Sequence, residues 1–470
     1  MQRKANGKTT SAVRIAAVAG AALVAAIGLS RHHAAAQQQA YEAFELGTTI
    51  GDGFTIAAVG DLIMAFPASR LADPARQAAF DVVRRADVGF ANMESTILDA
   101  ATWDGDFAGP FVGTPDVAED VKNLGFDIVA RSNNHSGEYG IEGLLDTNER
   151  LARAGVVSAG SGESYWAARA PRFVSTDKGR VGLVATASSF SAGVVASPGR
   201  GEWTGRGGVS ALRTTRWWVV PPSMWSAVTT IREAFPTGGS LYAPLGETEN
   251  EITILGRRFR KADVDGPHWS YDVDQRDLND VLAMVREGKV KSDFLAVAIH
   301  SHETHGANGV WPEIDPLPGD FLPRFARAAI DNGADAFFGS GVHVPRGIEI
   351  YKDRPIFYGL GEFFRQMDIV GPAAWGGRGQ GGTFRGDRNS DPRKYESVIA
   401  VSEFTGGQLS EIRLHPTDLG HAERMAHRGV PRLASPEVAR RVLDRLRKLS
   451  EPFGTTLEIE DGVGVIRPEQ

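Results

Sequence analysis

The stretch FTIAAVGD (residues 54–61) is a short apolar run that ends in Gly60-Asp61. A run of this length without polar alternation is typical of a strand buried on both faces. A segment with helical spacing, PARQAAFDVVRRA (74–86), separates it from a second apolar run, DVGFANME (87–94), which ends at Glu94. The pattern therefore predicts a strand, a helix and a second strand, with a carboxylate at the end of each strand.

The same alternation continues along the chain. Helical spacing recurs at 115–125, 142–155, 275–288, 319–333 and 436–450, buried strands are expected at 126–135, 293–300 and 334–343, and hairpins at 170–190, 346–364 and 397–416. Such alternation predicts an α/β fold with a mixed sheet covered by helices on both faces. Sites in such folds gather at the carboxyl ends of the strands.

Polar residues follow five of these strands, and we expect them to converge on one edge of a sheet. They are Asp61, Glu94, Asn134 with His135, His300 with His302, and His343. Carboxylate, imidazole and amide oxygen together suit one or two divalent Zn, Mn or Fe ions. Two ions bridged by a carboxylate would lower the pKa of a water molecule and supply hydroxide at neutral pH. Each residue also has a structural alternative, since a Gly-Asp after a strand is common in turns and N-caps.

The segment IHSHETHG (299–306) contains three of the chain's 11 histidines. In an extended strand end, His300 and His302 lie on one face, so the pair is predicted to bind metal. Glu303 is expected to orient a histidine from behind. His305 is either a further ligand or a solvated side chain.

Composition excludes some functions. The formal net charge is −7, with 42% hydrophobic and 23% charged residues, so a basic footprint for nucleic acid is missing. A mildly acidic surface repels a polyanionic substrate unless a metal or a local basic patch offsets it. The chain has no cysteine, which removes disulfides and cysteine nucleophiles.

The N-terminal residues indicate export. Basic residues precede an apolar run at 15–30, and Ala34-Ala35-Ala36 offers a cleavage site, so residues 1–36 are predicted to be a signal peptide. The alternative is an uncleaved membrane anchor. Residues 37–53 are expected to be a polar linker, 54–420 the main domain with an irregular insertion at 191–273, and 421–470 a helical extension. The expected location is periplasmic or extracellular.

Several blocks resemble the bacterial capsule-synthesis CapA family. They are VGDLIM (59–64), ANMES (91–95), ARSNNHSGEYGIEGLLDT (130–147), GRGGVSALR (205–213), AIHSHE (298–303) and the long block 325–364, and the resemblance runs from about 54 to about 416. It implies a calcineurin-like metallophosphatase fold, a four-layer α/β/β/α sandwich, and a link to poly-γ-glutamate synthesis. It also implies that His135 is the acid or oxyanion partner, and that the ligands are Asp61, Glu94, Asn134, His300 and His343.

The chain departs from the family pattern at three positions. Ser340 stands where the family usually has a histidine, Glu362 where it has an asparagine, and Glu138 where it has an aspartate. Because Ser340 removes a nitrogen, His302 or His305 is predicted to replace it. The other residues expected near the site, as support or substrate contacts, are Asn92, Asn133, Glu303, His305, Ser340 and Glu362.

These observations lead to three functional hypotheses. The first is an exported metal-dependent hydrolase that attacks an amide or ester bond of poly-γ-glutamate or a similar envelope polymer. The second is a non-catalytic polymer-binding component of capsule assembly, and the third is a phosphoesterase. The expected partners are a polyanionic polymer such as poly-γ-glutamate and a membrane-bound capsule synthase, with no nucleic acid.

Overall fold

The computed structural model describes residues 49–99, 101–105, 111–235, 247–307, 310–366, 391–424 and 427–468. The chain divides into the units Met1–Thr48 and Thr49–Gln470. The predicted signal peptide or anchor (1–36), and all but the last residues of the linker (37–53), therefore lie outside the described residues. None of the helices in the described part of the chain is both long and apolar enough to cross a membrane.

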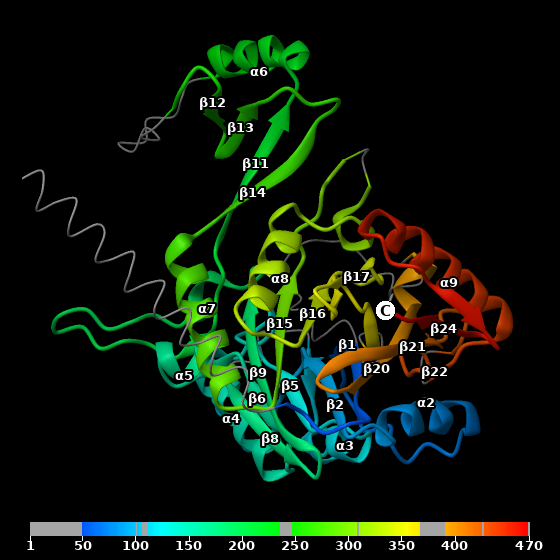
Figure 1. Ribbon diagram of the computed structural model, residues 1–470. Helices are drawn as coiled ribbons and strands as arrows, with labels where there is room; N and C mark the ends of the chain where they lie inside the picture. Colours follow the sequence, from blue (N-terminus) through cyan, green and yellow to red (C-terminus); the bar gives the residue numbers. More distant parts are fainter. Residues whose placement is uncertain are drawn as a thin grey trace, which may run out of the picture. The chain divides into compact units, whose positions relative to one another are not determined.

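Two large mixed sheets form the centre of the second unit (Figure 1). The ten-stranded sheet has the order β23 (Glu458–Glu460), β24 (Val463–Ile466), β21 (Gln408–Asp418), β20 (Glu396–Thr405), β1 (Phe54–Ile63), β2 (Val88–Met93), β5 (Ile128–Ala130) and β6 (Val157–Ala159), with β19 (Glu362–Arg365) beside β1 and β22 (Arg432–Leu433) beside β21. The six-stranded sheet has the order β17 (Ile348–Tyr351), β18 (Arg354–Phe357), β16 (Ala336–Gly341), β15 (Phe294–Ser301), β9 (Gly179–Ala187) and β8 (Arg172–Thr176).

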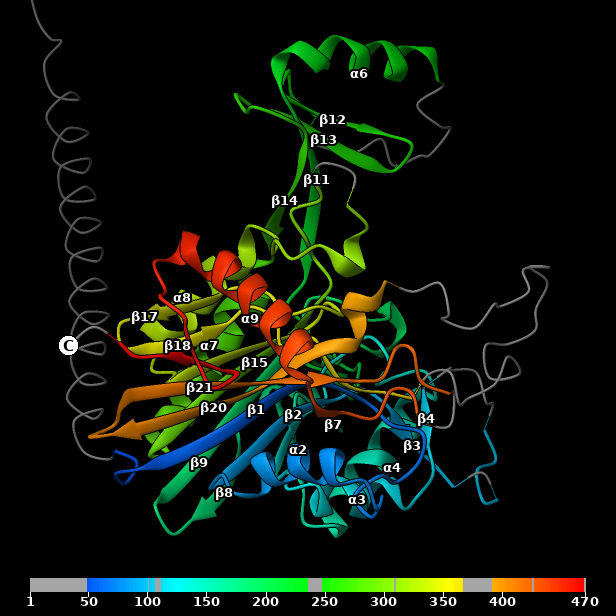
Figure 2. The same ribbon diagram turned by 90° about the vertical axis from the view of Figure 1, so that its right-hand side faces the viewer.

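The two sheets pack face to face, with helices on both outer faces (Figure 2). Helices α2 (Pro74–Arg84), α3 (Val117–Asn123) and α4 (Gly140–Arg153) cover the ten-stranded sheet, whereas α7 (Gln275–Val290) and α8 (Phe321–Asp331) cover the six-stranded sheet. The predicted four-layer α/β/β/α order is confirmed. The expectation of one sheet edge is wrong, because the five strands that carry the site belong to two different sheets.

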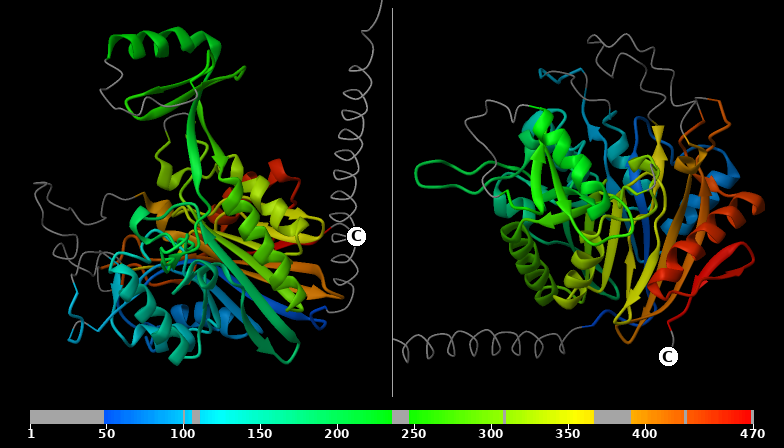
Figure 3. Two further views of the ribbon diagram at one scale, coloured as in Figure 1. Left: turned by 90° about the vertical axis from the view of Figure 1, so that its left-hand side faces the viewer. Right: turned by 90° about the horizontal axis from the view of Figure 1, so that it is seen from above.

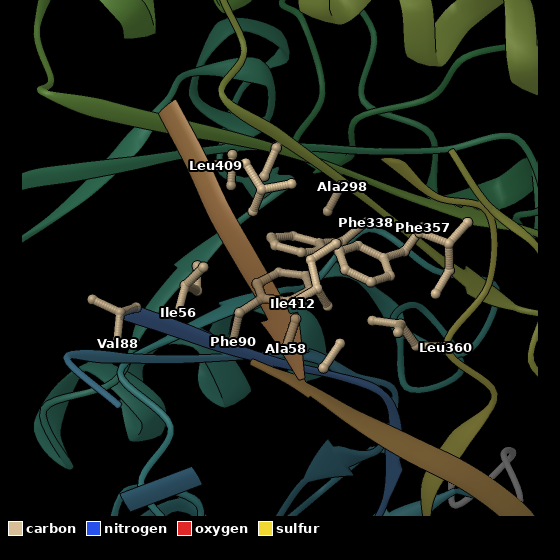
Figure 4. Close-up of a cluster of buried hydrophobic side chains, with 14 of the residues drawn as sticks. Ile56, Ala58, Val88, Phe90, Ala298, Phe338, Phe357, Leu360, Leu409 and Ile412 are labelled. Carbon is tan, nitrogen blue, oxygen red and sulfur yellow. The ribbon is translucent and has the colours of Figure 1, made fainter. Parts of the chain in front are cut away.

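The core between the sheets consists of alternate residues of the inner strands (Figure 4). Phe90 of β2 stacks on Phe338 of β16, with ring centroids 4.7 Å apart. Helix α9 (Pro436–Ser450) adds Val442, Leu443 and Leu446 to the same core. Apolar burial of this kind is the main stabilising contribution to such a sandwich.

The helices begin where the sequence places their signals. Asp73 caps α2 by accepting hydrogen bonds from the backbone of Ala75 and Arg76, and Pro74 follows at the first helical position. Asp274 caps α7 and Ser435 caps α9 in the same way. Because these caps precede amphipathic segments, the sequence periodicity predicted these helices to within a few residues.

The segment 191–273 differs from the expectation of an irregular insertion. It contains β11 (Thr214–Val220), α6 (Pro222–Ala234), β12 (Glu251–Ile254), β13 (Arg257–Lys261) and β14 (His268–Val273), and these strands form a four-stranded sheet in the order β12-β13-β11-β14. We call residues 214–273 the lobe, which stands away from the two main sheets (Figure 3, left). A small core that includes Val220, Trp225 and Ile252 joins α6 to the sheet.

The C-terminal segment also differs from a purely helical extension. Besides α9, it contributes β22, β23 and β24 to the ten-stranded sheet. The hairpins β8–β9, β17–β18 and β20–β21 lie where the sequence predicts them. Lys352 and Asp353 at the β17–β18 turn both have positive φ, as a tight hairpin turn requires.

Candidate metal site

The ends of β1, β2, β5, β15 and β16 meet where the two main sheets face each other. Asp61 lies near the end of β1 at a register irregularity, where its neighbour Gly60 approaches the backbone of Gly361. A Cβ at position 60 would lie 1.8 Å from the Gly361 carbonyl oxygen, so only glycine fits. This close approach brings the Asp61 carboxylate into the space between the sheets, where Gly341 N donates to its Oδ2 at 3.1 Å.

Glu94, His300 and His302 form the centre of the site. One ligand atom from each lies within 4.8 Å of the others. His300 Nε2 is 3.7 Å from Glu94 Oε1 and 3.2 Å from His302 Nε2. Asn134 Oδ1 lies 2.8 Å from the same His300 nitrogen. Three nitrogen and oxygen ligands with an amide oxygen beside them are a donor set suited to Zn, Mn or Fe.

Burial makes the ionised carboxylates of this cluster costly unless a cation compensates them. Burial raises the pKa of Glu94 well above its usual range, and the charges of Asp61 and Glu362 raise it further. Burial likewise raises the pKa of Asp61 to about 7, although the hydrogen bond from Asn92 opposes the shift. Burial also lowers the pKa of His302 to about 3, so its ring is neutral and its nitrogen lone pair is available. Neutral imidazoles facing buried carboxylates match what a divalent ion requires.

Glu94 supplies the clearest test of whether a metal fits. Its side chain is fully buried, and neither carboxylate oxygen accepts a hydrogen bond from any described residue. A buried carboxylate without partners is costly unless a cation or a proton compensates it. The residues present therefore fit a divalent ion.

Asp61 lies beside this centre. Its Oδ1 accepts a hydrogen bond from Asn92 Nδ2 at 2.7 Å and is 3.8 Å from His300 Nδ1. Asn92 Oδ1 in turn accepts from Asn133 Nδ2 at 3.2 Å. Asn92 and Asn133 thus hold the carboxylate and the loop after β5 in place.

His343 forms a second group with Glu362 and Arg365. His343 Nδ1 lies 2.5 Å from Glu362 Oε1, and Arg365 Nη1 donates to both Glu362 oxygens at 2.5 and 2.6 Å. Burial would raise the pKa of Glu362, but the charges of Arg365 and His343 outweigh it and lower the pKa. The edge of His343 approaches His302, with ring centroids 5.5 Å apart.

Ser340 and His305 occupy different places. Ser340 Oγ lies 3.3 Å from His300 Nδ1, so it contacts the opposite side of that ring from Glu94. His305 is separated from the cluster and stacks on His268 of the lobe, with ring centroids 4.9 Å apart. Of the two histidines proposed to replace the nitrogen missing at position 340, the structure brings only His302 into the cluster.

Glu303 supports the segment around His302 through two serines. Its Oε2 accepts from Ser188 Oγ at 2.6 Å and Ser189 Oγ at 3.0 Å. Ser189 Oγ also accepts from the backbone N of His302 at 2.8 Å. Glu303 therefore positions the backbone of His302 rather than a histidine ring.

His135 lies on the more open side of the site. Its Nε2 is 3.6 Å from Glu94 Oε1, and its Nδ1 is 2.5 Å from Glu138 Oε1. Because a carboxylate only accepts, Nδ1 carries the proton and Nε2 faces the cluster. Phe111 covers the ring, with centroids 3.9 Å apart.

Sequence reasoning missed two buried arginines. Arg131 donates to the backbone carbonyls of Met93 and Ser95 at 2.8 and 2.9 Å, which fixes the loop that carries Glu94. Burial lowers the pKa of Arg131 to about 10, and the charge of Glu94 opposes this shift. Arg365 neutralises Glu362, as described above. The available signal was an arginine directly after a buried apolar run, IVAR (128–131) for Arg131 and EFFR (362–365) for Arg365.

The fold and the site together define an α/β sandwich with a histidine–carboxylate cluster between its two sheets. Residues 55–367 match the family described as Bacterial capsule synthesis protein PGA_cap. The chain therefore belongs to this bacterial capsule synthesis family, the CapA family related to poly-γ-glutamate capsule synthesis.

Three relatives illustrate the range of similarity. The uncharacterized protein y4sH of Sinorhizobium fredii is 39% identical over 448 residues, which cover 89% of this chain and 94% of the relative. A probable polyglutamine synthesis accessory protein of Mycobacterium tuberculosis is 29% identical over 290 residues, which cover 61% of this chain and 57% of the relative. The PGA biosynthesis protein CapA of Bacillus subtilis is 35% identical over 82 residues, which cover 17% of this chain and 19% of the relative.

Proposed function

We propose that this protein is an exported metal-dependent hydrolase that cleaves an amide or ester bond of poly-γ-glutamate or a similar envelope polymer. The observation that carries the proposal is the buried Glu94 carboxylate, which lacks hydrogen-bond partners among the described residues and faces His300 and His302. The family membership supports the polymer as the substrate class. A membrane-bound capsule synthase is the proposed cellular partner.

Glu94, His300 and His302 would hold the ion, with Asn134 and Asp61 as further oxygen ligands and His343 beside them. When bound, a divalent ion would polarise the scissile carbonyl and lower the pKa of a water molecule. The chain's own residues orient the reacting groups and donate the proton to the leaving group. Asn92 and Asn133 fix the Asp61 carboxylate, and Phe111 limits water around His135.

His135 is the proposed proton donor to the leaving nitrogen or oxygen. Its Nδ1 proton is held by Glu138, so its other nitrogen is directed at the cluster. A carboxylate behind an imidazole stabilises the charged ring and fixes its orientation, which is what a general acid requires. Its side chain is 17% exposed, which leaves access for a polymer end or loop.

The experiment compares the wild-type chain with His300→Ala and with His268→Ala as a matched histidine control in the lobe. Bound metal is measured by elemental analysis, and cleavage of poly-γ-glutamate by the release of shorter chains. We expect His300→Ala to lose metal and at least 100-fold in cleavage, an effect on the order of 10² as for lost ligands or catalytic groups. A wild-type protein that cleaves the polymer equally well after metal removal would refute the proposal.

A second candidate is polymer binding without turnover. It is favoured by Ser340, whose hydroxyl lies at His300 Nδ1 where the resembling family usually has a histidine. Polymer binding by a metal-loaded protein that cleaves neither the polymer nor a phosphomonoester would favour this candidate. Cleavage of the phosphomonoester alone would favour a phosphoesterase.

A further inference from the structure

An ion pair connects a loop of the six-stranded sheet with a segment of the ten-stranded sheet, and its carboxylate interacts electrostatically with His302 and His343. Glu313 lies in the short 3-10 helix η2 (Pro312–Ile314), which belongs to the loop that follows β15 of the six-stranded sheet. Lys394 lies in η5 (Pro392–Tyr395), which directly precedes β20 of the ten-stranded sheet. Lys394 Nζ donates to Glu313 Oε2. The pair therefore connects segments that are 81 residues apart and belong to different layers.

The ion pair is tied to the site from both sides. The loop that contains Glu313 starts at His302, and its ends are joined by His305 N to Leu317 O at 3.1 Å. On the other side, Tyr395 lies under the guanidinium of Arg365, 5.5 Å from the ring centroid, and Arg365 binds the Glu362 that contacts His343. Burial would raise the pKa of Glu313, but the hydrogen bond from Lys394 and the charge of His343 outweigh it and lower the pKa.

The exposures of the two partners differ. The Lys394 side chain is 10% exposed, whereas that of Glu313 is 41% exposed. A nearly buried ammonium needs an anionic partner at all times, because an unpaired buried charge is costly. The more exposed carboxylate is the partner that another carboxylate can replace without leaving the lysine unpaired.

The proposed substrate has the chemistry for this exchange. A γ-linked glutamate keeps a free α-carboxylate next to each amide bond. The site itself holds three buried carboxylates, Asp61, Glu94 and Glu362, and the chain carries a net charge of −7. A polyanion therefore needs a cationic contact close to the cluster.

We infer that Lys394 binds a carboxylate of the substrate chain next to the cleaved bond, and that Glu313 occupies this place when no substrate is bound. This inference rests on the proposed function for the identity of the substrate. It makes Lys394 a specificity-determining residue and Glu313 an internal competitor. The two residues then have opposite effects on affinity, which a purely structural ion pair would not produce.

The test measures the binding of a γ-glutamyl decamer to the full-length chain by calorimetry. Lys394→Gln should raise the dissociation constant about 10- to 100-fold, as expected for losing a hydrogen bond between charged groups. Glu313→Gln should lower the same constant several-fold, since the competing carboxylate is gone. The decamer with its carboxylates converted to methyl esters should bind both variants as it binds the wild type.

Lys352→Gln is the matched control, because Lys352 forms a similar ion pair with Asp331 on the exposed β17–β18 turn. Lys352→Gln should leave the affinities for the acid decamer and for its methyl ester unchanged. The inference is overturned if Lys394→Gln binds the acid decamer like the wild type, if it weakens acid and ester forms equally, or if Glu313→Gln fails to tighten binding. The Glu313→Gln arm decides alone if Lys394→Gln does not fold.

Failure of this inference is distinguishable from failure of the proposed function. If the wild type cleaves the polymer and Lys394→Gln binds it with unchanged affinity, the lysine subsite is refuted and the hydrolase proposal stands. If the polymer binds tightly through Lys394 but is not cleaved, the hydrolase proposal is refuted and the lysine subsite stands.

Discussion

Glu138 Oε1 lies 2.5 Å from Nδ1 of His135, three residues earlier in the same loop. The contact holds the His135 ring with its other nitrogen toward Glu94, 3.6 Å away. The loop between β5 and α4 therefore supplies both the group that faces the cluster and the group that orients it.

Glu138→Gln should lower the rate of polymer cleavage about 10- to 100-fold, the usual effect of removing an orienting partner. Metal content should stay at the wild-type level, because Glu138 does not belong to the Glu94–His300–His302 group. Steady-state kinetics and elemental analysis measure the two effects. Glu149→Gln is the control, since Glu149 pairs with Arg153 on the exposed face of α4. Loss of metal in Glu138→Gln would contradict an orienting role.

His302→Ala and His305→Ala should differ in metal binding. His302 Nε2 is 3.2 Å from His300 Nε2, whereas the His305 ring stacks on His268 of the lobe. We expect His302→Ala to bind metal about 10- to 100-fold more weakly and His305→Ala to bind it like the wild type. Competition with a chromophoric chelator measures the affinities. Equal losses in the two variants would show that the loop binds metal through different residues.

The residues of the candidate site were predictable from sequence because each follows an apolar run that has to be a buried strand. The division of these strands between two sheets was not predictable, because pairing between distant strands leaves no local signal in the sequence. The same holds for His305, since the loop turns away after His302 and Trp269 N donates to the His305 carbonyl at 2.8 Å. The lobe was missed for another reason. A strand such as RRFRK (257–261) is polar on most positions and lacks the apolar run or alternation that marks a strand.

Phe338→Ala should destabilise the sandwich strongly. The ring is buried between the sheets and stacks on Phe90 at 4.7 Å, so its removal leaves a cavity that two layers of strands cannot close. We expect the free energy of unfolding to fall by about 3–5 kcal/mol, measured by chemical denaturation. Phe66→Ala, at a position 45% exposed, should change it by less than about 1 kcal/mol. Similar losses in both variants would contradict the assignment of Phe338 to the core.

Asp277 of α7 supports the base of the lobe and gives a prediction about pH. Its carboxylate accepts from Arg169 Nη2 at 2.8 Å and from Arg213 Nε at 2.6 Å, and its side chain is fully buried. Burial would raise the pKa of Asp277, but the hydrogen bonds from Arg213 and the charges of both arginines outweigh it and lower the pKa. The ionised carboxylate therefore stabilises the folded state.

Asp277→Asn should reduce the free energy of unfolding by about 2–4 kcal/mol at pH 7, because Arg169 stays buried without a countercharge. A lowered folded pKa means that the stabilisation is complete above the unfolded pKa of about 3.9 and is lost as the pH falls through the folded value. The difference between wild type and Asp277→Asn should thus be constant from about pH 5 to pH 8 and shrink below about pH 4. Asp331→Asn, which removes an exposed partner of Lys352, should show neither effect. A difference that grows as the pH falls would mean that the arginines do not hold the Asp277 carboxylate in its ionised form.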